Sequence, residues 1–135
     1  MEKMIKIQSD RERAASLLAL AELRLNKIKT FDEAKESSLI AEGFYEVTKE
    51  MITSLLFIDG YKTLSHKDLI DYIFSKYKGV FPEHEINMID RLRKLRNNIV
   101  YYGVSVEPSF IKRNKQDILQ IISKLDKLCR KKLAD

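Results

Sequence analysis

Apolar side chains recur at steps of three and four residues along almost the whole chain, which is the spacing of one face of an α-helix. The clearest series is Ile40, Phe44, Val47, Met51 and Leu55. The 135 residues include only four glycines and two prolines, too few turn residues for a strand-rich fold. We therefore expect one all-α domain over residues 1–135, an antiparallel, up-down bundle of about five helices.

The first two expected helices begin at capping boxes, in which a hydroxyl side chain and a glutamate three residues later satisfy the free N–H groups of the first turn. The first helix follows Ser9, with Glu12 as its partner. The second begins near Thr30, with Glu33 as its partner, and runs to about Ile58. The connections between helices are expected to be short.

Glycines and prolines set the remaining boundaries. Gly60 is expected to end the second helix, and the third covers about Ser65–Gly79. The fourth covers about Pro82–Gly103, and Pro108 opens the fifth. Gly43 lies inside the second helix, where it weakens the helix by about 1 kcal/mol relative to alanine and predicts the close approach of a neighbour. On the third helix the expected inward side chains are Leu69, Ile70, Ile73 and Phe74.

Composition excludes several classes of site. Cys129 is the one cysteine and His66 and His84 are the only histidines, so we expect no disulfide framework, no metal site and no cofactor. There is no Gly-rich phosphate loop, and Cys129 is expected to be inert packing. No apolar run approaches the roughly 20 residues that span a bilayer, and the first ten residues lack a signal-peptide core. A soluble, cytoplasmic protein is expected.

The positive charge is concentrated at one end of the chain. Residues 111–135 hold eight bases and three acids, which accounts for the whole formal net charge of +5. A basic final helix can attract phosphate groups, although such a charge also serves solubility alone. One open alternative is therefore a general nucleic-acid-binding bundle that uses the basic C-terminal helix.

The most informative stretch runs from Arg91 to Gly103. Its apolar face is formed by Ile89, Leu92, Leu95 and Ile99. Arg96 falls at the border of this face, where a guanidinium needs a carboxylate or a carbonyl, or else lines a groove. One interpretation is structural: Arg96 pairs with an acid of the second helix. The candidate acids, otherwise expected to form a solvated ladder, are Glu42, Glu46 and Glu50.

The same stretch resembles a family. HEPN domains are small helical bundles with Arg-Asn-x-x-x-His on a late helix, and the corresponding run here extends from Arg96 to Tyr101. The resemblance covers about Ile40 to Leu128. Within it, residues 41–72 look like the family's long helix, glycine turn and Ser/Thr-His start of the next helix.

The resemblance implies a homodimer in which the motif helices, here the fourth, face each other. In active members this arrangement forms a metal-independent ribonuclease, and many act in toxin–antitoxin or defence systems beside a nucleotidyltransferase. Carried over by motif position, the catalytic residues would be Arg96, Asn97 and Tyr101. The residues expected to contact phosphate or RNA are Arg93, Arg96, Tyr102, Lys124, Lys127 and Lys131.

The chain departs from the motif at Tyr101, which replaces the histidine. An imidazole transfers protons near neutral pH, whereas a phenol has an ordinary pKa of about 10 and is a poor base there. His66 and His84 lie at expected helix starts far from Arg96 in sequence, so neither is expected to replace it. The leading hypothesis is a non-catalytic or regulatory module that binds RNA or a protein partner. The alternative is a ribonuclease using Arg96, Asn97 and Tyr101.

Overall fold

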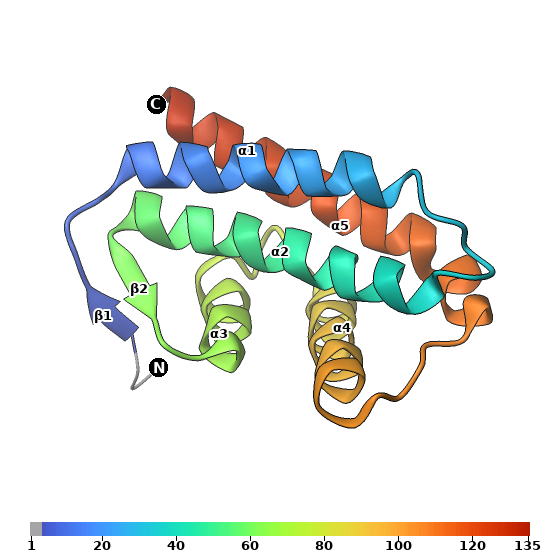
Figure 1. Ribbon diagram of the computed structural model, residues 1–135. Coiled ribbons are helices and arrows are strands. Elements are labelled where there is room, and N and C mark those ends of the chain that lie inside the picture. Colours follow the sequence, from blue (N-terminus) through green and yellow to red (C-terminus); the bar gives the residue numbers. More distant parts are fainter. Residues whose placement is uncertain (1–3) are drawn as a thin grey trace.

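The computed structural model describes residues 4–135, which form five α-helices and one two-stranded antiparallel sheet (Figure 1). The helices are α1 (Arg11–Ile28), α2 (Ser37–Asp59), α3 (His66–Lys76), α4 (Glu83–Tyr102) and α5 (Pro108–Ala134). The strands are β1 (Met4–Lys6) and β2 (Tyr61–Thr63), with Ile5 opposite Lys62. The expected all-α helical bundle is confirmed, and the small sheet is a feature that the sequence did not predict.

The central element is α2. Fifteen of its 23 residues are buried, because the other helices cover it on several sides. In Figure 1, α1, α2 and α5 run across the view, whereas α3 and α4 lie beneath α2 and are seen nearly end-on. Two helices therefore cross the other three at a steep angle, and they lie side by side beneath α2.

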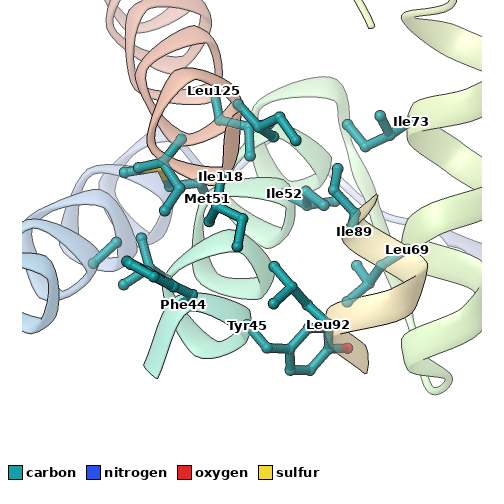
Figure 2. Close-up of a cluster of buried hydrophobic side chains, with 14 of the residues drawn as sticks. Phe44, Tyr45, Met51, Ile52, Leu69, Ile73, Ile89, Leu92, Ile118 and Leu125 are labelled. Carbon is teal, nitrogen blue, oxygen red and sulfur yellow. The ribbon is translucent and has the colours of Figure 1, made fainter. Parts of the chain in front are cut away.

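One apolar core joins α2 to its neighbours (Figure 2). The labelled side chains come from α2, α3, α4 and α5 and point toward one another. The labelled members are Phe44, Tyr45, Met51, Ile52, Leu69, Ile73, Ile89, Leu92, Ile118 and Leu125. Each is buried, so helices far apart in sequence are held together mainly by removing apolar surface from water.

The contact between α1 and α2 is close at Gly43. A β-carbon at this position would lie 2.7 Å from Cδ1 of Ile28, well inside van der Waals distance. Glycine is kept inside α2 because a larger side chain would collide with the end of α1. The close approach predicted from Gly43 is confirmed.

Both expected capping boxes are wrong in position. Asp10 caps α1, since its Oδ1 accepts a hydrogen bond from the backbone N–H of Arg13 at 3.0 Å. The Ser9 hydroxyl instead donates to the carbonyl of Ile58, 2.7 Å away. Ser9 thus ties the start of α1 to the end of α2 and does not serve as the cap.

The second helix begins at Ser37 and not near Thr30. Asp32 explains the difference, because its Oδ1 accepts hydrogen bonds from the N–H groups of Ala34 and Lys35, at 2.8 and 3.0 Å. Such a side-chain turn competes with helix formation. Glu36 stabilises the turn further by accepting from the N–H of Asp32 at 2.8 Å. The α1–α2 connection is consequently eight residues long.

The helix ends are closer to expectation. Gly60 and Gly103 have φ values of 86° and 64°, the left-handed conformation that glycine adopts most easily, and they end α2 and α4 as predicted. The third helix ends at Lys76, three residues before Gly79. Phe74 was expected to face inward, but it is exposed, with the Lys78 ammonium 5.5 Å from its ring centroid. Over residues 4–135, no helix combines the length and apolar character needed to cross a membrane.

A polar cluster ties together the ends of α2, α3 and α5. The carboxylate of Asp59 accepts hydrogen bonds from the hydroxyls of Tyr72 and Tyr77 and from the ammonium of Lys132. The Asp59 side chain is 8% exposed, and that of Lys132 is 25% exposed. Burial works to raise the pKa of Asp59, but the hydrogen bonds from Lys132 and the two tyrosines outweigh it, so the pKa lies below its ordinary value.

Candidate functional site

The site suggested by the sequence lies where the second half of α4 packs on α2. Ile89 and Leu92 of α4 are buried against the core, which directs Arg96, one turn further along, toward α2. The Arg96 Nε lies 3.4 Å from Oε1 of Glu46. This Nε is buried and makes no hydrogen bond within residues 4–135, so the contact is an ion pair without hydrogen-bond geometry. Of the two interpretations of Arg96, the structural pairing with an acid of α2 is the one observed.

Glu46 is shared between two cations. Lys49 Nζ lies 2.8 Å from Oε2 of Glu46, and Arg96 approaches the other oxygen. Burial works to raise the pKa of Glu46, but the hydrogen bond from Lys49 and the charges of Lys49, Arg96 and Arg24 outweigh it. The pKa of Glu46 therefore lies below its ordinary value. The carboxylate remains ionised and holds Arg96 in place.

The expected solvated ladder of acids on α2 is wrong. Glu50 is buried and forms two hydrogen bonds with Arg24 of α1, each 3.0 Å long. Hydrogen bonding to Glu50 is the main cause of the raised pKa of Arg24. Because neighbouring helices cover α2 on several sides, the helix has no solvated face at Glu50. The acids of α2 thus neutralise arginines from α1 on one side and α4 on the other.

His66 is the residue that sequence reasoning missed. It opens α3, and its ring centroid lies 5.8 Å from that of Tyr45, a fully buried residue of α2. Burial lowers the pKa of His66 below its ordinary value, and the positive charges of Lys49 and Arg96 lower it further. The separation of His66 and Arg96 in sequence therefore does not isolate the imidazole from the charge of Arg96. Thirty residues separate them in sequence, but the steep crossing of α3 and α4 beneath α2 brings them within electrostatic range.

The end of α4 carries an exposed apolar surface, which we call the α4 tip: Val100, Tyr101, Tyr102 and Val104. Their exposed fractions are 48, 67, 78 and 53%. The segment that follows is fixed, since the Ser37 hydroxyl donates to the Val106 carbonyl at 2.6 Å and the Val106 N–H donates to Ser38 at 2.8 Å. The α4 tip is therefore a largely exposed apolar surface next to a segment that is tied to α2.

The three proposed catalytic residues do not converge in one chain. Arg96 faces α2, Asn97 is half-buried, and Tyr101 is exposed at the α4 tip. Five residues of an ideal helix turn the side chain of Tyr101 about 140° away from that of Arg96. A single chain consequently offers no position where Arg96 and Tyr101 could contact the same phosphate.

The predicted RNA-contacting bases divide into two groups. Arg93, beside the α4 tip, pairs with Asp90 at 2.9 Å. Lys124 of α5 pairs with the buried Glu85 of α4 at 2.8 Å. Glu85 and Tyr102 are separated by about 26 Å along α4, at 1.5 Å per residue. Lys127 and Lys131 are exposed on α5. The predicted set therefore does not form one surface, and Lys124 already neutralises an acid of the bundle.

Cys129 is buried, and burial disfavours its reactive thiolate form. Burial raises the pKa of Cys129 to about 12, so its thiol is protonated at neutral pH. Its Sγ donates a weak hydrogen bond to the Met51 carbonyl at 3.4 Å, and inert packing is confirmed. Within residues 4–135, no three His, Cys, Asp or Glu side chains are grouped as metal ligands.

Comparisons with profiles of known protein families, with curated proteins and with solved structures gave no match to this chain.

Proposed function

We propose that this protein is a non-catalytic interaction module of HEPN type that associates with a second copy through the α4 tip. The observation that carries the proposal is the contrast between Arg96 and Tyr101. Arg96 is held by Glu46 at 3.4 Å, whereas Tyr101 is 67% exposed on the other side of α4. Arg96 is therefore paired within its own chain, whereas Tyr101 is accessible to a partner.

The composition of the α4 tip suits association. Tyrosine contributes large apolar area with a polar hydroxyl at its edge, which is why it is enriched among residues that dominate interfaces. Two adjacent tyrosines between two valines form a surface that water solvates poorly. A two-fold axis through such a surface would place the same patch of each copy against the other.

Support for the HEPN part of the proposal comes from the order of elements. The long α2 is followed by a glycine turn at Gly60, a helix opening at His66, and an α4 that carries the Arg96-Asn97 pair. A toxin–antitoxin or defence role beside a nucleotidyltransferase follows from the same resemblance. Co-purification of this chain with the product of a neighbouring nucleotidyltransferase gene would test that role.

Serine at positions 101 and 102 is expected to weaken self-association strongly. Loss of a buried interface tyrosine costs about 2 kcal/mol, which is roughly 30-fold in the dissociation constant. Sedimentation velocity over a concentration series should show dimers of the unchanged protein and monomers of Tyr101→Ser/Tyr102→Ser. The matched control is Leu20→Ser/Leu23→Ser, which removes two exposed apolar residues from α1. An unchanged protein that is monomeric at high micromolar concentration, or a dimer lost only in the α1 variant, would contradict the proposal.

A second candidate partner is single-stranded RNA. No acidic residue occurs between Arg91 and Val106, and the exposed rings of Tyr101 and Tyr102 could stack on bases. Affinity that falls with salt and is reduced by the two serine substitutions would place RNA at the α4 tip. Affinity reduced instead by Lys127→Ala and Lys131→Ala would place it on α5.

A further inference from the structure

A surface pocket of about 320 Å³ lies between α2, β2 and the start of α3. Four of its lining residues are apolar: Leu56, Phe57, Leu64 and Leu69. The others are polar: Lys49, Thr53, Lys62, Thr63, Ser65 and His66. Three elements that are separate in sequence thus contribute two lysines and a histidine to the lining of one concavity, and Lys49 also pairs with Glu46 at 2.8 Å.

The charge around this pocket is unbalanced toward the positive. His66 experiences the positive charges of Lys49 on α2 and of Arg96 and Arg93 on α4, against the negative charge of Glu46. Lys62 lies on β2 and is exposed. Asp68, two residues after His66 in the first turn of α3, has its Oδ2 3.5 Å from the hydroxyl of Thr63. Lys49 and Arg96 share the single negative charge of Glu46, and Arg93 pairs with Asp90, so the surroundings of the imidazole hold a small excess of positive charge.

We propose that this pocket binds a phosphate group, with Lys49, Lys62 and His66 as its ligands. The two ammonium groups supply charge, and the protonated imidazole donates a hydrogen bond to a phosphate oxygen. The excess of cations suits a dianionic monoester or inorganic phosphate better than a neutral ligand. The apolar side of the pocket would contact the carbon skeleton to which the phosphate is attached.

Binding and protonation are coupled at this site. Burial and neighbouring cations favour neutral His66 in the empty pocket, and its pKa lies below the ordinary value. A bound dianion adds an opposite charge, favours the protonated imidazole and raises that pKa. By reciprocity, a phosphate of fixed charge binds more tightly as the pH falls through the titration of His66, whereas the ligand's own protonation, with a second pKa of about 6, acts against this.

The experiment is a pH titration of the two histidines by NMR, with and without inorganic phosphate. His84 is exposed on the first turn of α4 outside the pocket lining, so its signals provide an internal reference. Phosphate is expected to move the titration midpoint of His66 upward, while sodium chloride at matched ionic strength is not. A response of His84 equal to that of His66 would overturn the proposal, as would no response of His66.

Substitutions localise the effect. Lys62→Ala is expected to weaken phosphate binding at least about tenfold, the effect of losing one charge-assisted hydrogen bond. Lys67→Ala removes the same charge from an exposed position of α3 outside the lining and is expected to leave binding unchanged. Equal losses in the two variants would show a diffuse charge effect and overturn the proposed pocket.

If the bound phosphate belongs to RNA, the inference rests on the proposed function. Binding of inorganic phosphate tests the pocket independently of that function. A short RNA with a 5′-phosphate binding more tightly than the same RNA with a 5′-hydroxyl, and losing that advantage in Lys62→Ala, would assign an RNA terminus. Phosphate binding with equal affinity for the two RNAs would support the pocket and assign a free small-molecule phosphate. Monomeric behaviour in sedimentation would contradict the role of the α4 tip without altering the phosphate result.

Discussion

Replacing Asp59 with asparagine is expected to lower the free energy of unfolding by about 3 kcal/mol. The substitution removes the charge that compensates the partly buried Lys132, and breaking a buried ion pair on one side costs about 3–5 kcal/mol. The lower end applies because the Lys132 side chain is 25% exposed. Chemical denaturation at neutral pH measures the change.

Two control variants test whether the loss of stability in Asp59→Asn comes from the unpaired charge of Lys132 or from the removal of any carboxylate. Asp71→Asn on the exposed side of α3 should change stability by less than about 0.5 kcal/mol. Asp59→Asn combined with Lys132→Met should recover much of the loss, since no uncompensated charge is left buried. A loss as large in Asp71→Asn, or none in Asp59→Asn, would show that the cluster does not stabilise the fold.

The same cluster predicts a pH dependence with a definite sign. The pKa of Asp59 lies below its ordinary value in the folded protein, so its contribution is fully present above the ordinary carboxyl pKa of about 4. That contribution is lost as the pH falls through the lower, folded-state value. The pKa of Lys132 is raised by Asp59 and Tyr77 in spite of burial, which acts to lower it. Its contribution is therefore lost at high pH, as the pH rises through the raised value.

The unchanged protein is expected to cleave RNA feebly or not at all without metal. General acid–base catalysis contributes about 10²–10⁴-fold, and Tyr101 replaces the imidazole that would supply it. Tyr101→His is expected to gain metal-independent cleavage of at least about 10²-fold. Because Arg96 and position 101 diverge within one chain, this gain requires Arg96 to leave Glu46 and meet position 101 of a second copy. Arg96→Ala in that background should remove the gain. A fluorescent single-stranded RNA assay with chelator present measures all three proteins.

Two outcomes of the RNA assay would contradict the non-catalytic account. Robust cleavage by the unchanged protein that is lost in Tyr101→Phe would make Tyr101 part of a ribonuclease site. Cleavage that survives Tyr101→Phe but is lost in His66→Gln would assign the proton transfer to His66, which the structure brings near Arg96. No gain in Tyr101→His would show that the α4 tip is not a ribonuclease site lacking one proton carrier.

Glycine and proline residues predicted several helix boundaries correctly. Gly60, Gly103 and Pro108 mark boundaries because backbone conformation at glycine and proline depends little on distant contacts. The start of α2 was missed because Asp32 forms a turn that competes with a helix of ordinary propensity. Pairing between β1 and β2 joins segments more than fifty residues apart, and three-residue strands carry no periodic signal.

Some features of the candidate site could also be predicted from the sequence, and others could not. The pairing of Arg96 with an acid of α2 could be anticipated, since helical spacing placed a guanidinium at the border of an apolar face. The nearness of His66 could not, because it depends on the crossing of α3 and α4 beneath α2. The burial of Glu50 could not be predicted either, because it depends on Arg24 of the neighbouring helix α1, which forms two hydrogen bonds with the Glu50 carboxylate.

Crosslinking at the end of α4 tests the role of the α4 tip most directly. The buried Cys129, whose pKa is raised to about 12, leaves an introduced surface cysteine as the reactive thiol. Tyr102→Cys and Leu23→Cys replace residues that are 78 and 69% exposed, so random collisions should affect the two variants alike. Under mild oxidation we expect disulfide-linked dimers of Tyr102→Cys and monomers of Leu23→Cys. Equal crosslinking of both variants, or crosslinking of Leu23→Cys alone, would contradict association through α4.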